Sequence, residues 1–135
     1  MKILRVARYS LLIFIGVTSG STFITVLIGV NTLSEFPIWQ SLIYQSVPLA
    51  ILATCLFGLM AYRVPENAYL YGISVFLAAN ILAYISLFLL MRELYIPPDW
   101  WLGFILQFSS ALIGTFLGAN WKKRQNTASE VLPND

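Results

Sequence analysis

The sequence predicts an all-α integral membrane protein whose four transmembrane helices form an antiparallel, up-and-down bundle. Of its 135 residues, 59% are hydrophobic and 10% are charged, whereas a soluble domain usually carries about 25% charged residues. The 14 charged residues also leave four windows that contain none of them: 9–34, 36–62, 67–91 and 100–121. Each window is longer than the roughly 20 residues that a helix needs to cross about 30 Å of hydrocarbon.

Four helices are expected in these windows, over about 9–30, 39–62, 68–91 and 100–121. Aromatic side chains that favour the headgroup layer mark their ends, as expected for the interfacial belts of a membrane protein. They are Tyr9, Trp39, Tyr62, Tyr69, Tyr71, Tyr95, Trp100, Trp101 and Trp121. The helices are predicted to form a single domain over residues 1–124. The polar remainder, 125–135, is predicted to be a disordered cytoplasmic tail.

The first helix is expected to be retained rather than cleaved as a secretory signal. Lys2, Arg5 and Arg8 resemble the positive segment of a signal peptide. The apolar stretch that follows nevertheless continues to about Val30, which is longer than the roughly 7–15 residues of a signal peptide, and no clear Ala-x-Ala cleavage site follows it.

The positive charges predict that both termini are cytoplasmic, because short segments rich in Lys and Arg stay on that side of the membrane. One side of the predicted topology has seven such residues and the other has only Arg92. The seven are Lys2, Arg5, Arg8, Arg63, Lys122, Lys123 and Arg124. This N-in, C-in arrangement requires an even number of crossings, and it describes a multi-pass protein of the cell membrane, of the bacterial inner-membrane type.

Small residues are expected to hold the helices together, because burying apolar surface does little to drive association inside a bilayer. Two helices carry a GxxxG pair, Gly16 with Gly20 and Gly114 with Gly118. Ser110 lies on the same face as the second pair, and Gly58 ends a small-residue stripe in the second helix. These contacts are expected to serve either packing within one chain or a homo-oligomer, and Gly114→Leu or Gly118→Leu should disturb whichever assembly uses them.

Pro48 is expected to kink the second helix. It has no N–H to donate to the carbonyl four residues earlier, and its ring clashes with that turn. Such a kink is either purely structural or marks an opening to a site.

Four polar side chains at membrane depth are the candidate site: Gln45, Asn80, Tyr84 and Gln107. A side-chain amide in lipid must find hydrogen-bond partners. One interpretation is that these groups bond across helices and hold the bundle together. The alternative is that they line a polar cleft open to the outer face of the membrane.

The sequence predicts neither a catalytic centre nor a cofactor or metal site. It contains no His, and no Asp, Glu, Lys or Arg falls at membrane depth, where proton-coupled carriers need one. The lone cysteine, Cys55, is interpreted as a small apolar residue. We therefore expect a noncatalytic protein with no nucleic-acid partner.

The basic cluster Lys122, Lys123 and Arg124 follows Trp121 at the end of the fourth helix. It serves either as a topology signal alone or also as a binding site for anionic lipid headgroups, at roughly 1 kcal/mol per basic residue.

A gapless shift of 62 residues also aligns the two halves of the chain at a few positions, as an internal repeat would. The aligned pairs are Tyr9 and Tyr71, Phe14 and Phe76, Thr18 and Asn80, Trp39 and Trp101, and Gln45 and Gln107. Such pairs also arise by chance in so hydrophobic a chain.

Two functions are compatible with these features. The first is an accessory or interaction subunit of a larger membrane complex, contacting a membrane-protein partner and the surrounding lipids. The alternative is a small carrier that acts as a homo-oligomer and translocates lipids or lipid-linked substrates, with Pro48, Gln45, Asn80 and Gln107 around its path.

Overall fold

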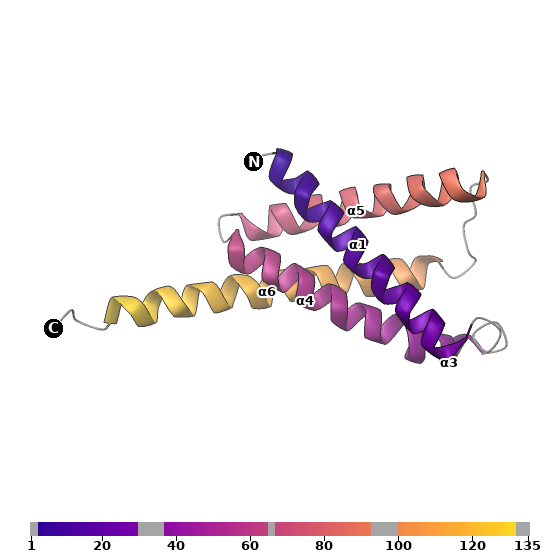
Figure 1. The fold of residues 1–135 in the computed structure, drawn as a ribbon. Helices are drawn as coiled ribbons and strands as arrows, with labels where there is room; N and C mark the ends of the chain where they lie inside the picture. Colours follow the sequence, from indigo (N-terminus) through magenta and orange to yellow (C-terminus); the bar gives the residue numbers. More distant parts are fainter. Residues whose placement is uncertain (1–2, 30–36, 65–66, 93–99, 132–135) are drawn as a thin grey trace.

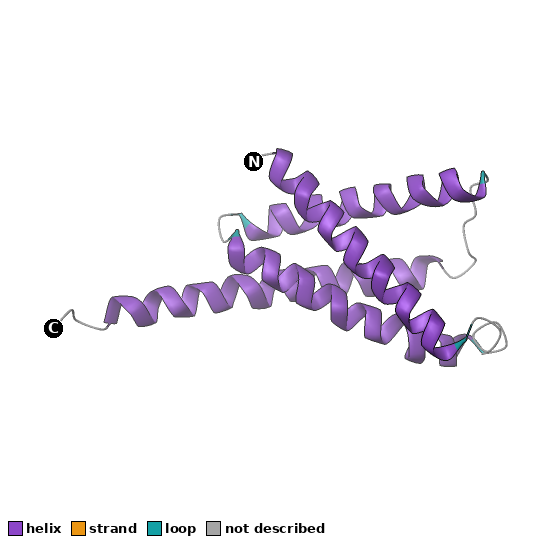
Figure 2. Ribbon diagram, in the orientation of Figure 1, coloured by secondary structure: helices purple, strands orange, loops and turns teal. Residues whose placement is uncertain are grey.

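The computed structural model describes residues 3–29, 37–64, 67–92 and 100–131. Every regular element in these ranges is helical (Figure 2). Four helical spans within them are long and apolar enough to cross a membrane. The predicted all-helical fold with four such helices is therefore confirmed.

The elements follow one another in the order expected of an up-and-down bundle (Figure 1). The second span is built from three consecutive pieces. The bounds are α1 (Ile3–Ile28), α3 (Ile38–Ser41), the π-helical segment η1 (Leu42–Ser46), α4 (Val47–Arg63), α5 (Ala68–Met91) and α6 (Trp100–Val131).

Two helices are longer than their charge-free windows. α1 begins at Ile3 rather than near Tyr9, and α6 continues to Val131 rather than ending near Trp121. Residues 125–131, for which the sequence predicts a disordered tail, are thus helical in the structure. The reason is that Lys, Arg, Gln, Ala and Glu are good helix formers in water, and no Gly or Pro interrupts α6 after Gly118. Charge-free length indicates where lipid would end, but it does not indicate where the helix ends.

The carboxyl end of α1 is defined by Gly29. Its φ of 89° lies in the left-handed region that favours glycine. Its N–H donates to the carbonyl of Thr25 at 2.9 Å, which closes the last turn of the helix. The predicted end at Val30 lies outside the described residues.

Pro48 affects the second span through a change of helix type. The five residues Leu42–Ser46 form a π-helical turn, and the regular helix α4 resumes at Val47 with Pro48 in its first turn. A proline is tolerated at such a position because the first N–H groups of a helix lack intrahelical acceptors. The wide turn absorbs the clash that the ring would cause in an uninterrupted α-helix.

The helices are arranged as two packed pairs. α4 makes its most extensive contact with α6, while α1 packs mainly on α5 and crosses the bundle obliquely (Figure 1). The start of α1, the end of α4 and the start of α5 lie toward one end of the bundle. The last turns of α6 project from that end, beyond the other helices.

The contact between α4 and α6 is built on glycine. A Cβ at Gly114 or Gly118 would collide with the α4 backbone, at the carbonyl oxygens of Thr54 and Gly58 respectively. A Cβ at Gly58 would meet the Gly114 oxygen at 3.4 Å. Only residues without a side chain allow the two backbones to approach so closely.

The GxxxG pair of α1 packs within the chain as well. Added Cβ atoms at Gly16 and Gly20 would meet the side chains of Leu56 at 2.9 Å and Leu52 at 2.6 Å, both on α4. Of the two roles expected for the GxxxG pairs, the structure therefore places both pairs at contacts inside one chain. Ser110 is also buried, and its hydroxyl donates to the Leu106 carbonyl of its own helix at 2.7 Å.

Candidate functional site

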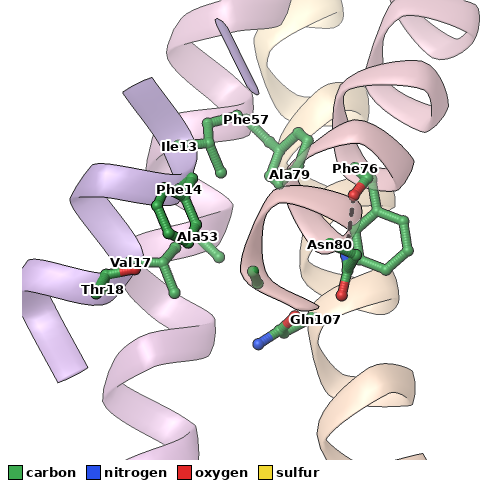
Figure 3. A pocket seen from close by; sticks show the side chains of 11 residues that line it. Ile13, Phe14, Val17, Thr18, Ala53, Phe57, Phe76, Ala79, Asn80 and Gln107 are labelled. Atoms are coloured by element: carbon green, nitrogen blue, oxygen red, sulfur yellow. Dashed lines mark hydrogen bonds between the residues drawn. The ribbon is translucent and has the colours of Figure 1, made fainter. Parts of the chain in front are cut away.

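A cavity of about 80 Å³ lies between the four helical spans (Figure 3). Its lining is predominantly apolar and comes from α1, α4, α5 and α6. The lining residues are Ile13, Phe14, Val17, Thr18, Ala53, Phe57, Phe76, Ala79, Asn80, Ala83 and Gln107.

The cavity lies about halfway along α5, whereas Gln107 reaches it from a position seven residues after the start of α6. Asn80 is 12 residues from the first residue of the 24-residue helix α5, which places it about 18 Å from the start and about 17 Å from the end at 1.5 Å per residue. In a bilayer spanned by α5, this depth corresponds to the middle of the hydrocarbon layer.

Three polar side chains border the cavity: Thr18, Asn80 and Gln107. Asn80 donates one N–H to the Phe76 carbonyl of its own helix at 2.9 Å. That bond leaves its second N–H and its carbonyl oxygen for other partners. The Gln107 side chain extends from α6 toward the part of the cavity between α5 and the α1/α4 side (Figure 3). Among the described residues it has no hydrogen-bond partner.

The structure brings together two of the four predicted site residues. Asn80 and Gln107 line the same cavity, whereas Gln45 lies in η1 and Tyr84 lies one turn beyond Asn80 with 38% of its surface exposed. Neither of these two lines the cavity. Thr18 does, although the sequence indicated it only through its alignment with Asn80 in the shift of 62.

Four hydroxyl groups inside the helical spans form hydrogen bonds within their own helices and not between helices. The hydroxyls of Thr22, Thr25, Thr54 and Ser110 each donate to the carbonyl four residues earlier in their own helix, at 2.7–2.9 Å. A side chain that satisfies itself locally adds nothing between helices. Close backbone approach is therefore the main cohesive feature of the described bundle.

Thr115 is a buried polar residue that the sequence did not single out. It is 1% exposed, and within the described residues its hydroxyl has no hydrogen-bond partner. The hydroxyl faces Gly72 of α5, where an added Cβ would lie 2.6 Å from it. A small hydroxyl at this point allows α5 and α6 to approach, at the expense of an unmade hydrogen bond.

Of the residue pairs aligned by the shift of 62, two pairs on α1 and α5 line the cavity with both members, and the pairs on the other helices do not. Phe14 and Phe76, like Thr18 and Asn80, line the same cavity from α1 and α5. Gln107 does so without its counterpart Gln45. The α1/α5 pair therefore follows the alignment, whereas the α4/α6 pair does not.

The chemistry available to the cavity is that of neutral hydrogen bonding. Its lining contains amides and a hydroxyl but no ionisable side chain. No cluster of three or more His, Cys, Asp or Glu residues that could hold a metal is found in the described residues. Cys55 is exposed on α4, away from the cavity.

The basic residues after Trp121 have different surroundings. The Lys122 ammonium lies 5.1 Å from the centroid of the Tyr62 ring, a cation–π contact between α6 and α4. Arg124 instead lines a surface hollow with Asn120 and Trp121. The Tyr62 hydroxyl donates to the Gln125 Oε1 at 2.7 Å, so a second contact joins the same two helices at this level.

The chain matches no protein-family model, and no curated protein or solved structure is significantly similar to it.

Proposed function

We propose that this chain is a noncatalytic, multi-pass protein of a bacterial-type inner membrane, with both termini in the cytoplasm, and that it is an accessory or interaction subunit of a larger membrane complex. The observation that carries the proposal is the projecting end of α6. This helix continues for ten residues past Trp121, to Val131, which corresponds to about 15 Å.

The projecting segment has the properties of a surface for a polar partner. Lys123, Arg124, Asn126 and Thr127 are exposed, and Figure 1 shows the segment extending beyond α4 and α5. A preformed helix binds a partner with less loss of conformational entropy than a disordered tail would. It also places charges outside the apolar span, where they are solvated until a partner arrives.

The size of the cavity supports the same proposal. At about 80 Å³, it is well below the roughly 300–1,000 Å³ of sites that enclose small organic ligands. In this conformation the cavity has room for very small molecules only.

The proposal is tested by site-specific photo-crosslinking in native membranes. A photoreactive amino acid at Lys123 or Thr127 is expected to give a discrete adduct with one other protein. The matched control is Ile113, which lies on the same helix, is 53% exposed and belongs to the apolar span. The adduct should persist in Gln107→Leu, since the cavity is not the docking surface.

Two results would count against this function. One is that the photoreactive group, at Lys123 and at Thr127 alike, crosslinks the chain only to lipid or to another copy of itself. The other is an adduct that forms equally well from Ile113, because contact would then not depend on the projecting helix.

A second candidate function, a small carrier or lipid-translocating homo-oligomer, is favoured by the polar cavity at mid-depth. Its test is the movement of a fluorescent phospholipid between the leaflets of liposomes that contain the purified protein. A carrier should accelerate this movement, Gln107→Leu should abolish the acceleration, and Gln45→Leu should not. Equal rates with and without the protein would remove lipid translocation from consideration.

A further inference from the structure

The cavity around Asn80 and Gln107 presents more hydrogen-bonding capacity than the protein satisfies. A glutamine side chain offers two N–H donors and a carbonyl acceptor, and no described residue bonds to those of Gln107. Asn80 uses one N–H on Phe76. In hydrocarbon these remaining groups have no alternative partner, and leaving them unpaired is strongly unfavourable.

The cavity also has enough room for such partners. One water needs at least about 10–15 Å³ of accessible space, and the cavity provides about 80 Å³. Apolar cavities of this size stay dry, but this one has polar groups on α1, α5 and α6, and a buried water typically makes two to four hydrogen bonds. Both conditions for stable hydration are therefore present.

We infer that this cavity is a binding site for water at the middle of the membrane-spanning bundle. A small cluster of water molecules accepts hydrogen bonds from the side-chain N–H groups of Gln107 and donates a hydrogen bond to the side-chain carbonyl oxygen of Asn80. The Thr18 hydroxyl borders the cluster on the α1 side. This inference goes beyond the proposed subunit function and does not depend on it. It requires only that the four spans lie in a bilayer.

The competing occupant is a lipid acyl chain. The apolar lining, which includes Phe14, Val17 and Ala83, would accept a hydrocarbon chain. That occupant would leave the Gln107 amide and the side-chain carbonyl oxygen of Asn80 without partners, and for this reason water is the favoured occupant.

The test is solid-state NMR of the full chain in lipid bilayers, with magnetisation transferred from water protons to side chains. The protein is labelled with ¹⁵N at glutamine and isoleucine. The Gln107 side-chain amide is expected to gain signal at least tenfold faster than the backbone amide of Ile81, a residue that is 59% exposed on the lipid-facing side of α5. The side chain of Gln125, which is exposed outside the apolar span, gives the rate for an amide at the surface.

The Gln107 signal is identified by its loss in Gln107→Asn, which removes the labelled glutamine and keeps an amide at the position. If that variant does not fold, Gln107→Leu serves the same assignment. A Gln107 build-up as slow as that of Ile81, or faster transfer from lipid acyl protons than from water, overturns the inference. Because the measurement is made on the unmodified protein, failure of the partner or carrier experiments leaves its outcome unaffected.

Discussion

At the scale of single residues, the glycines at helix contacts matter more for packing in this fold than most of the larger residues do. Gly114 and Gly118 bring α6 against the α4 backbone, and Gly16 and Gly20 receive leucine side chains from α4. Inside a bilayer, such contacts take the place of the hydrophobic burial that stabilises a soluble core, because lipid is as apolar as the side chains themselves. Changes at such positions should therefore have the largest effects on stability.

Gly118→Ala is expected to lower the free energy of unfolding by about 1–3 kcal/mol, because the new methyl group collides with the Gly58 backbone and the helices must separate. The measurement is unfolding of the purified protein in mild detergent. Gly103→Ala is the matched control on the same helix, where an added Cβ would meet nothing within 4 Å. It should stabilise the protein by up to about 1 kcal/mol through helix propensity. Equal effects of the two substitutions would show that close packing is unimportant.

Thr115→Val is expected to raise the free energy of unfolding by about 1 kcal/mol. The substitution removes a buried hydroxyl that has no partner among the described residues and leaves a group of nearly the same size against Gly72. The same unfolding measurement applies. A clear loss of stability would instead indicate that the hydroxyl makes a bond, for example to water, that valine cannot make.

At the scale of elements, the helices differ in how closely their length follows the charge-free windows of the sequence. α5 coincides with its predicted window, 68–91. Asn67 lies immediately before this charge-free segment and Arg92 immediately after it. Asn67 and Arg92 both have positive φ, at 55° and 54°, so the right-handed helix stops immediately at each end. No described residue with positive φ lies near Tyr9 or Trp121, and α1 and α6 continue past these predicted ends.

Deletion of residues 125–135 tests the helical extension of α6. The described helix within this segment is 125–131, which is seven residues. We expect the far-ultraviolet circular dichroism of the shortened protein to correspond to about seven fewer helical residues per molecule. An unchanged helical signal would mean that the tail is disordered in solution.

The basic cluster provides a comparison between neighbouring positions. Arg124→Gln is expected to weaken retention of phosphatidylglycerol about fivefold, the equivalent of roughly 1 kcal/mol for one basic residue. Lys122→Gln should have a smaller effect, because that ammonium already lies over the Tyr62 ring. Native mass spectrometry in detergent with added lipid gives both values. A larger loss for Lys122→Gln would reverse this assignment.

At the scale of the whole molecule, the charges and the bundle geometry lead to one expected topology. The start of α1, the end of α4 and the projecting end of α6 lie toward the same end of the bundle. Seven of the eight basic residues belong to that end of the predicted topology. The positive-inside tendency therefore predicts that this end is cytoplasmic.

Reporter fusions test this topology directly. A reporter that is active only in the cytoplasm should be active when fused after Asp135 or inserted at 65–66. A reporter that is active only outside the membrane should be active when inserted at 93–99. A chain whose two termini report from opposite sides would contradict the four-crossing arrangement and the proposed function with it.

The sequence by itself determined the class of fold and the approximate position of every span. The reason is that the two strongest constraints, charge-free length and an internally satisfied backbone, are local properties of each segment. It also indicated which residues are small enough for close packing, including Gly114 and Gly118, because Gly is recognisable without knowledge of its neighbour.

Only the tertiary structure decided which of the polar residues meet. Asn80 and Gln107 come from different helices and line one cavity together with Thr18. Gln45 does not line it and lies in the π-helical turn before Pro48. The rotation of each helix about its own axis determines such meetings. In a chain that is apolar on nearly every face, the pattern of hydrophobic residues does not specify that rotation, and contacts between backbones from distant parts of the sequence do.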